Sequence, residues 1–167
     1  MWVLASMVEI FDELRVPVSQ YLRRLGLSQV DSEEIIQEVF LRLFKHLREE
    51  GPEGNLRGWA FRVAHNLAID KYKDQRRFAT KSPEEWVGLG DLLMDKSPNP
   101  EESLMSQEKV ARTNRAISSL SSLQLQCVCL RAEGFRYREI ADLLGVTTAT
   151  VAESLRRARR KLRGDEM

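Results

Sequence analysis

The stretch KSPEEWVGLGDLLMDKSPNPEE, residues 81–102, is the feature that most constrains how this chain can fold. It holds three prolines and two glycines, and both residue types disfavour the interior of a regular helix or strand. No long element can run through such a stretch, so the chain of 167 residues is divided there. We therefore predict two small domains, residues 1–80 and 103–167, joined by a linker over 81–102.

Helical spacing dominates the rest of the chain. In DSEEIIQEVFLRLFKHL, residues 31–47, apolar side chains recur every three or four positions, and long alternation of apolar and polar residues is absent from the chain. Apolar residues make up 43% and charged residues 31%, which suits helical domains that each have a modest core. The predicted fold class is all-α.

The chain contains no segment typical of membrane insertion or export. No apolar run approaches the roughly 18 residues that a membrane helix needs. The N-terminal sequence MWVLASMVEIFDEL lacks a basic flank and reaches an acid at Glu9, unlike a signal peptide. We expect a cytoplasmic protein without membrane insertion.

Three helices are expected in the first domain. The first spans about 7–25, Pro17 is a residue that can kink or interrupt it, and Gly26 ends it. The second is expected to be capped by Asp31, with Glu34 three residues later as in a capping box. The third starts near Asn55, and its inner stripe is expected to consist of Leu56, Trp59, Ala60, Val63, Leu67 and Tyr72.

The second domain has the capping and turn residues expected of a helix-turn-helix. A helix over about 103–118 is followed by SSLQLQCVCLRAEG, in which Ser121 and Gln124 resemble a capping box. A short helix over 137–144 stops at Gly145, and Thr147 can cap the last helix. A helix, a turn with glycine and a second helix rich in cations is the helix-turn-helix pattern.

Charge is unevenly distributed, although the net charge is only +1. Residues 55–81 hold seven Lys and Arg against two acids, residues 82–103 hold one against six, and residues 155–163 hold six cations and no acid. The helix dipole favours one or two cations near a C-terminus by under about 1 kcal/mol, so it does not account for six. A solvated basic helix remains the alternative, but cations on this helix can neutralise DNA phosphates.

The cysteines and histidines of the chain do not have the spacing that catalysis or metal binding requires. Cys127 and Cys129 are two positions apart, point to nearly opposite sides of a helix and are interpreted as small core residues. His46 and His65 do not have zinc-site spacing and are expected on helix surfaces. With no nucleophile–base pair and no phosphate-binding loop, we predict no metal, no cofactor and no enzymatic activity.

The two halves of the chain resemble two parts of one protein family. Residues 121–163, SSLQLQCVCLRAEGFRYREIADLLGVTTATVAESLRRARRKLR, closely resemble region 4 of bacterial sigma factors. Residues 31–47 and NLRGWAFRVAHNLAIDKYKDQRR, residues 55–77, resemble region 2. A chain with only these two parts is similar to the extracytoplasmic-function group. The resemblance implies a subunit that binds the β′ and β subunits of core RNA polymerase and promoter DNA, and directs transcription initiation at the nucleoid.

The region 2 resemblance implies roles for residues of the first domain. It assigns Glu34, Gln37 and Glu38 to a coiled coil on the β′ subunit, although helix stability alone also explains acids near a helix N-terminus. It assigns recognition and melting of the −10 element to Asn66, Asp70, Lys73, Arg76 and Arg77. The loop at 48–57 matches one that holds a flipped-out base. Trp59 is interpreted as a core residue, with base stacking as the lesser alternative.

The region 4 resemblance implies contacts with the −35 element. The predicted contact residues are Arg136, Tyr137, Thr148, Thr150, Glu153, Arg156, Arg157 and Arg160. The family usually reads VGTVKSRLHRAR where this chain reads TATVAESLRRAR, so Ala152, Glu153 and Ser154 depart from it. Glu153 can accept a hydrogen bond from a cytosine amino group or face solvent. We therefore predict that this helix holds DNA backbone more than bases.

The resemblance also implies regulation by a separate anti-sigma factor. The acidic linker suits the cationic nucleic-acid channels of a polymerase, and a solubilising spacer explains it nearly as well. The alternative function is a stand-alone helix-turn-helix regulator, which would need to be a dimer to read two half-sites.

Overall fold

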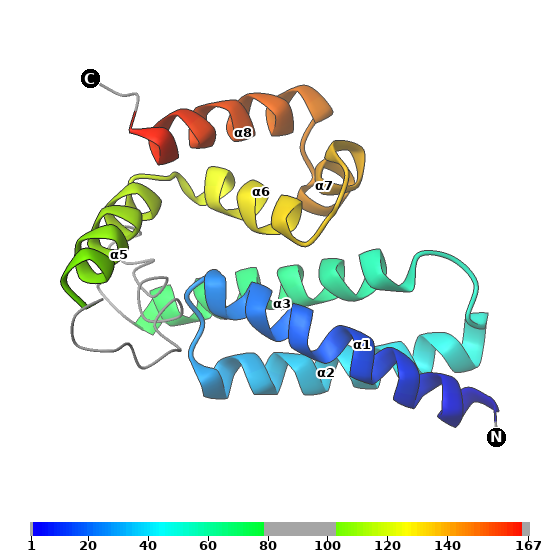
Figure 1. The fold of residues 1–167 in the computed structure, drawn as a ribbon. Coiled ribbons are helices and arrows are strands. Elements are labelled where there is room, and N and C mark those ends of the chain that lie inside the picture. The colour runs from blue at the N-terminus through cyan, green and yellow to red at the C-terminus, as the bar shows by residue number, and fades with distance from the viewer. Residues whose placement is uncertain (1, 79–102, 165–167) are drawn as a thin grey trace. The chain divides into compact units, whose positions relative to one another are not determined.

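The computed structural model describes residues 2–78 and 103–164, with side chains at 5, 7–75 and 107–164 (Figure 1). Within these ranges the chain forms seven α-helices and no strand, which confirms the all-α fold class. Residue contacts separate the chain into two compact units, one built on α1–α3 and the other on α5–α8. The predicted linker at 81–102 lies outside the described residues.

The first unit comprises α1 (Trp2–Arg24), α2 (Gln29–Glu50) and α3 (Leu56–Phe78). The first helix begins earlier than predicted and continues through Pro17. A proline inside a helix costs about 3 kcal/mol. Leu14 and Val18, on either side of Pro17, are buried, and each contributes about 1.5–3 kcal/mol. Burial therefore outweighs the lost hydrogen bond.

The start of α2 differs from the prediction. Ser28, not Asp31, is the N-cap, and its side chain accepts a hydrogen bond from the Asp31 backbone N–H at 3.1 Å. Both residues are good caps, and starting at Ser28 frees the Asp31 carboxylate for contacts with another helix. The apolar stripe of α2 is buried largely as the spacing predicted, through Ile35, Ile36, Val39, Phe40, Leu43 and Leu47.

The buried face of α3 is not the one that the sequence predicted. Of the predicted stripe only Ala60 is fully buried, whereas Leu56, Trp59, Val63, Leu67 and Tyr72 are half-buried. The fully buried apolar positions are Ala60, Phe61, Ala64 and Ala68. Three alanines allow close helix packing, and the Phe61 ring lies 5.5 Å from that of Tyr21 on α1. Close packing thus outweighs the greater apolarity of the leucine side chains.

His65 on α3 corrects the expectation of a surface histidine. Its side chain is buried, and Nδ1 lies 2.9 Å from the hydroxyl of Tyr21. Burial lowers the pKa of His65 to about 4, so the imidazole is neutral at pH 7. His46 is half-buried and stacks on Trp59 at 5.0 Å between ring centroids, so Trp59 lies at the core margin.

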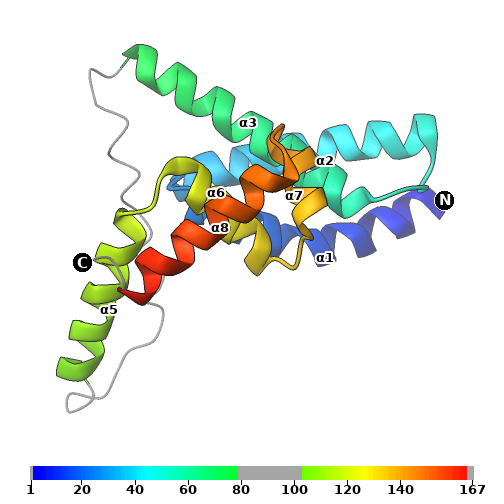
Figure 2. The same cartoon turned by 90° about the horizontal axis from the view of Figure 1, so that it is seen from above.

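The second unit comprises α5 (Ser103–Ser118), α6 (Ser122–Ala132), α7 (Tyr137–Leu144) and α8 (Thr148–Arg163). α8 packs along α6, and α7 lies at one end of this pair (Figure 1 and Figure 2). The capping box of Ser121 with Gln124 and the cap of Thr147 are both present as predicted. Gly145 ends α7 with a φ of +67°, which favours glycine, so the turn of the helix-turn-helix is confirmed.

The two cysteines are part of this second core, as predicted. Cys127 and Cys129 are both buried and unbridged, and burial raises their thiol pKa values to about 11 and about 12. Protonated, buried thiols are poor nucleophiles and poor metal ligands. No helix among the described residues is long and apolar enough to cross a membrane.

Candidate polymerase and DNA interfaces

A groove between α2 and α3 brings the three predicted polymerase-binding residues together. It is open, measures about 410 Å³ and is lined by Glu34, Ile35, Gln37, Glu38, Leu41, Arg42, Leu67, Asp70, Lys71 and Asp74. Leu41 is 66% exposed although it is large and apolar. The groove therefore combines an apolar patch with a mostly acidic rim.

Two acids of this groove, Glu34 and Glu38, already have cationic partners. Lys71 Nζ lies 2.8 Å from Glu34 Oε2, and Arg42 Nε lies 2.6 Å from Glu38 Oε1. Gln37 is exposed between these two acids on α2. Exposed ion pairs contribute only about 0–1 kcal/mol, so a partner's cations can replace the internal ones at little cost.

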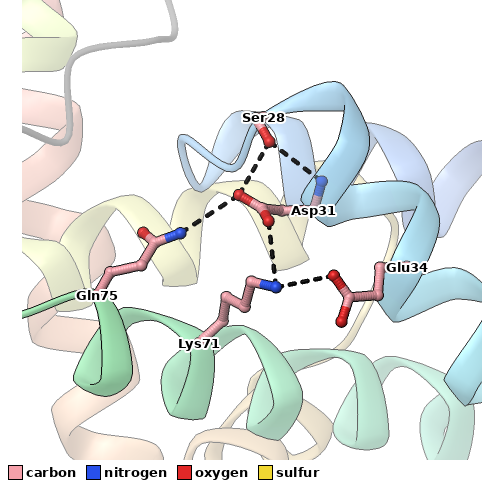
Figure 3. A network of polar contacts seen from close by, with 5 residues as sticks. All are labelled: Ser28, Asp31, Glu34, Lys71 and Gln75. Carbon is pink, nitrogen blue, oxygen red and sulfur yellow. Dashed lines mark hydrogen bonds and ion pairs between the residues drawn. The ribbon is translucent and has the colours of Figure 1, made fainter. Parts of the chain in front are cut away.

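Lys71 also belongs to a polar network that joins the first turn of α2 to the last turns of α3 (Figure 3). Its ammonium lies 3.2 Å from Asp31 Oδ1, while Ser28 Oγ and Gln75 Nε2 donate to Asp31 Oδ2 at 2.9 and 3.3 Å. Burial opposes the charge of Asp31, but hydrogen bonds from Ser28 and Lys71 outweigh it and lower the pKa of the carboxyl. The network holds Glu34 at the groove rim through Lys71. Sequence reasoning missed the network because its hydrogen bonds join residues up to 44 positions apart.

The predicted −10 residues divide into two groups. Asn66, Asp70 and Lys73 are all exposed on α3. Asp70 lines the acidic groove, so the structure groups it with the predicted polymerase-binding residues. Arg76 and Arg77 lie in the last turns of α3, but their side chains are outside the described set.

The loop between α2 and α3 is shorter than the predicted 48–57. It runs from residue 51 to residue 55, is mostly exposed, and has positive φ angles at Gly51 and Gly54. Asn55 Oδ1 accepts a hydrogen bond from the Gly58 backbone N–H at 2.9 Å and so caps α3. A Cβ at Gly58 would lie 2.6 Å from Asn55 Nδ2, so the glycine makes room for this cap.

At the N-terminal end of α8, the recognition helix, some of the polar groups predicted to contact DNA already form hydrogen bonds within the protein. The Thr150 hydroxyl lies 2.8 Å from that of Thr147, the capping residue, while Thr148 is exposed. At the start of α7, the Arg136 backbone N–H donates to Glu139 Oε2 at 2.7 Å. The side chains of Arg136 and Tyr137 are exposed there. Of the two threonines, Thr148 is thus the one available to a base or phosphate.

Farther along α8, Glu153 binds two of the predicted DNA-contacting arginines. Its carboxylate accepts from Arg156 Nε at 2.8 Å, from Arg156 Nη2 at 2.7 Å and from Arg157 Nε at 2.7 Å. Hydrogen bonds from Arg156 and Arg157 lower the pKa of Glu153 to about 2. Arg160 is exposed one turn later.

Ser154 lies on the buried side of α8, unlike its neighbour Glu153. It is buried beside Cys127 in the core of the second unit. Its departure from the family pattern therefore does not remove a DNA contact in this chain. Glu153 and Ala152 are the departures that lie outside the core.

Comparison with known proteins gives the same two parts in the same order. The family described as sigma-70 region 2 matches residues 10–78, and the family described as sigma-70, region 4 matches residues 111–162. The ECF RNA polymerase sigma factor SigE of Mycolicibacterium smegmatis is 32% identical over 142 residues, which cover 84% of this chain and 53% of that protein. The chain thus spans about half the length of this curated relative. The sigma factor CnrH of Cupriavidus metallidurans is 27% identical over 88% of this chain and 79% of its own length.

Two solved structures share the fold. CnrH in complex with the cytosolic domain of CnrY matches with a TM-score of 0.65 at 20% identity, over 96% of this chain and 87% of that one. The sigma factor RpoE of Bartonella quintana, in complex with the anti-sigma factor NepR, matches with a TM-score of 0.64 at 21% identity, over 93% and 95%.

Matches to both regions, in order and over most of the chain, leave one family. The chain belongs to the sigma-70 family of RNA polymerase sigma factors and, within it, to the extracytoplasmic-function type.

Proposed function

We propose that this protein binds core RNA polymerase and directs it to promoters through the −10 and −35 elements. The observation that carries this proposal is the groove between α2 and α3, where Glu34, Gln37 and Glu38 surround the exposed Leu41. A basic amphipathic helix is the complementary partner, because its apolar face can cover Leu41 while its cations replace Lys71 and Arg42. A coiled coil on the β′ subunit is the partner that the family implies.

The DNA contacts are divided between the two units. On α3 we assign Asn66, Lys73, Arg76 and Arg77 to the −10 element and move Asp70 to the polymerase-binding groove, since an anion facing phosphates is repelled. On the second unit we assign Arg136, Tyr137, Thr148, Arg156, Arg157 and Arg160 to the −35 region. Each small unit binds DNA weakly alone, and tethering both to one polymerase raises their effective concentration at the promoter.

The remaining assignments follow from this role. The polymerase supplies the catalysis, so the chain itself needs no enzymatic activity and no cofactor. It acts in the cytoplasm at the nucleoid. The match to RpoE bound to the anti-sigma factor NepR supports the proposal that a separate anti-sigma factor covers the polymerase- and DNA-binding surfaces of this chain as well.

Gel filtration with bacterial core RNA polymerase tests the proposal. The unaltered chain is expected to co-elute with the polymerase, and Gln37→Ala/Glu38→Ala is expected to weaken co-elution. Gln29→Ala/Glu33→Ala is the matched control, because it removes the same residue types from exposed positions of α2 outside the groove. If the chain elutes as a dimer and never with polymerase, a stand-alone regulator replaces this proposal.

A further inference from the structure

The contact between Glu153, Arg156 and Arg157 has a consequence for DNA recognition that rests on the proposed function. One carboxylate engages two guanidinium groups, three and four residues later on α8. The three side chains remain accessible, with exposed fractions of 41% for Glu153, 56% for Arg156 and 61% for Arg157. They lie away from the buried side of α8, which consists of Val151, Ser154 and Ala158.

The contact uses the donors that would otherwise bind phosphate. Arg156 presents both Nε and Nη2 to Glu153, and this edge of a guanidinium is the one that grips a carboxylate or phosphate with two parallel hydrogen bonds. Arg157 commits its Nε to the same carboxylate. The Glu153 carboxylate lowers the net charge of the three side chains from +2 to +1, and while the contact persists it keeps guanidinium donors away from the negatively charged DNA backbone.

Cytosine is the base that best matches a carboxylate in the major groove, because the amino donor of adenine lies beside the N7 acceptor of the same base. The exocyclic amino group of cytosine is a donor there, and Glu or Asp can accept its hydrogen bond. When Glu153 accepts from cytosine, it gives up part of its contact with Arg156 and Arg157, and both arginines can turn to phosphates. On DNA without a cytosine at that position, the carboxylate keeps the arginines or is left unpaired next to phosphates.

We propose that Glu153 is a specificity-determining residue that competes with DNA phosphates for Arg156 and Arg157 and releases them where a cytosine faces it. The residue thereby weakens binding to arbitrary DNA and couples the strength of the backbone contact to the identity of one base. This mechanism discriminates by penalising wrong sites as well as by favouring the right one. It also refines the prediction that α8 contacts mainly the DNA backbone. Two of those contacts, by Arg156 and Arg157, then depend on the base that faces Glu153.

The first test uses the full chain without polymerase and a duplex of random sequence, so it does not depend on polymerase binding. Glu153→Gln keeps the size of the side chain and removes its charge. We expect it to bind the duplex more tightly and to add two phosphate contacts, which steepens the slope of log affinity against log salt by about 1.8. Between 50 and 200 mM salt its advantage over the unaltered chain should therefore shrink about tenfold.

Two further variants show whether the gain passes through the arginines. Glu108→Gln also removes one exposed acid, but from α5, where the residues three and four positions after Glu108 are not both arginines. This variant should change the salt slope little. Adding Arg156→Ala/Arg157→Ala to Glu153→Gln should abolish the gain. Equal behaviour of Glu153→Gln and Glu108→Gln would overturn the proposal and leave the contact as helix stabilisation alone.

The second test uses the complex with core polymerase and promoter duplexes varied base by base through the −35 region. The unaltered chain should prefer cytosine at one position, and Glu153→Gln should lose that preference while binding all variants at least as well. A base preference that is identical in both proteins would contradict the role in specificity. Failure to form the complex at all would instead count against the proposed function, and the first test would still stand.

Discussion

The two units hold their functional charges in different ways. In the first unit, Lys71 on α3 holds Asp31 and Glu34 on α2, so the contacts join residues 37 to 40 positions apart. In the second unit, Glu153 holds Arg156 and Arg157 within a single helical turn. The first arrangement depends on the packing of two helices, whereas the second is preserved wherever α8 is helical. Conditions that loosen packing should therefore affect the polymerase-binding face before the −35 face.

Acidification is expected to show the largest difference between the units. The pKa of His65 is lowered to about 4 in the folded state and is near 6.5 when unfolded, so the unfolded state binds more protons between these values. The contribution of neutral His65 to the stability of the first unit is thus fully present above about pH 6.5. It is lost as the pH drops toward 4, which lowers the free energy of unfolding by about 3 kcal/mol at most.

Native-state hydrogen exchange at pH 7 and pH 5 measures this effect for each unit. Protection of α3 amides should fall at pH 5 more than protection of α8 amides, because the buried polar side chains described in the second unit, Gln124, Gln126 and Ser154, do not titrate in this range. His65→Gln keeps a polar partner for Tyr21 and should remove the pH dependence of α3. Equal loss of protection in both units would contradict this prediction.

A charge at Leu41 is expected to cause the next largest effect. Leu41→Asp should weaken binding to core polymerase by roughly ten- to a hundredfold, because burying a leucine contributes about 1.5–3 kcal/mol. Competition binding with labelled polymerase measures this change. Val30→Asp is the matched control, since Val30 is 73% exposed on the same helix but does not line the groove. A similar loss in the control would place the contact elsewhere on α2.

Removing the charge of Asp31 tests the network between the helices. Asp31→Asn should lower the free energy of unfolding of the first unit by under about 1 kcal/mol, because solvent screens the pair with Lys71. Folding lowers the pKa of Asp31 below the ordinary aspartate value of 3.8, so its contribution is present above that value and lost as the pH falls through the folded pKa. Urea unfolding at pH 7 and pH 3 measures both effects. Asp74→Asn, an exposed acid on the same groove, serves as the control.

The smallest expected effect is a gain of function. Lys71→Met removes the internal cation that pairs with Glu34 and should raise polymerase affinity about two- to fivefold while slightly reducing stability. This result would parallel the tighter DNA binding expected of Glu153→Gln, with the charges reversed. A loss of polymerase affinity would show instead that Lys71 positions Glu34 for its partner.

The sequence alone determined most of what is local, although the cap of α2 is Ser28 and not Asp31. Helical periodicity, the caps at Ser121 and Thr147, and the turn at Gly145 were all predicted correctly, because each depends on residues within a few positions of one another. The two-region resemblance likewise identified the family, since its motifs are contiguous. The pairing of Glu153 with Arg156 and Arg157 also follows from helical spacing once α8 is known to be a helix.

Only the tertiary structure decided which faces meet. The burial of Phe61 and His65 in place of Leu56 and Leu67 depends on how α3 packs against α2 and against Tyr21 of α1, which no periodicity encodes. The grouping of Asp70 with Glu34 and Glu38, and the use of Asp31 by Lys71, require α2 and α3 to lie side by side. Side-chain burial and charge pairing between helices are set by packing, and packing is a property of the whole unit rather than of any segment within it.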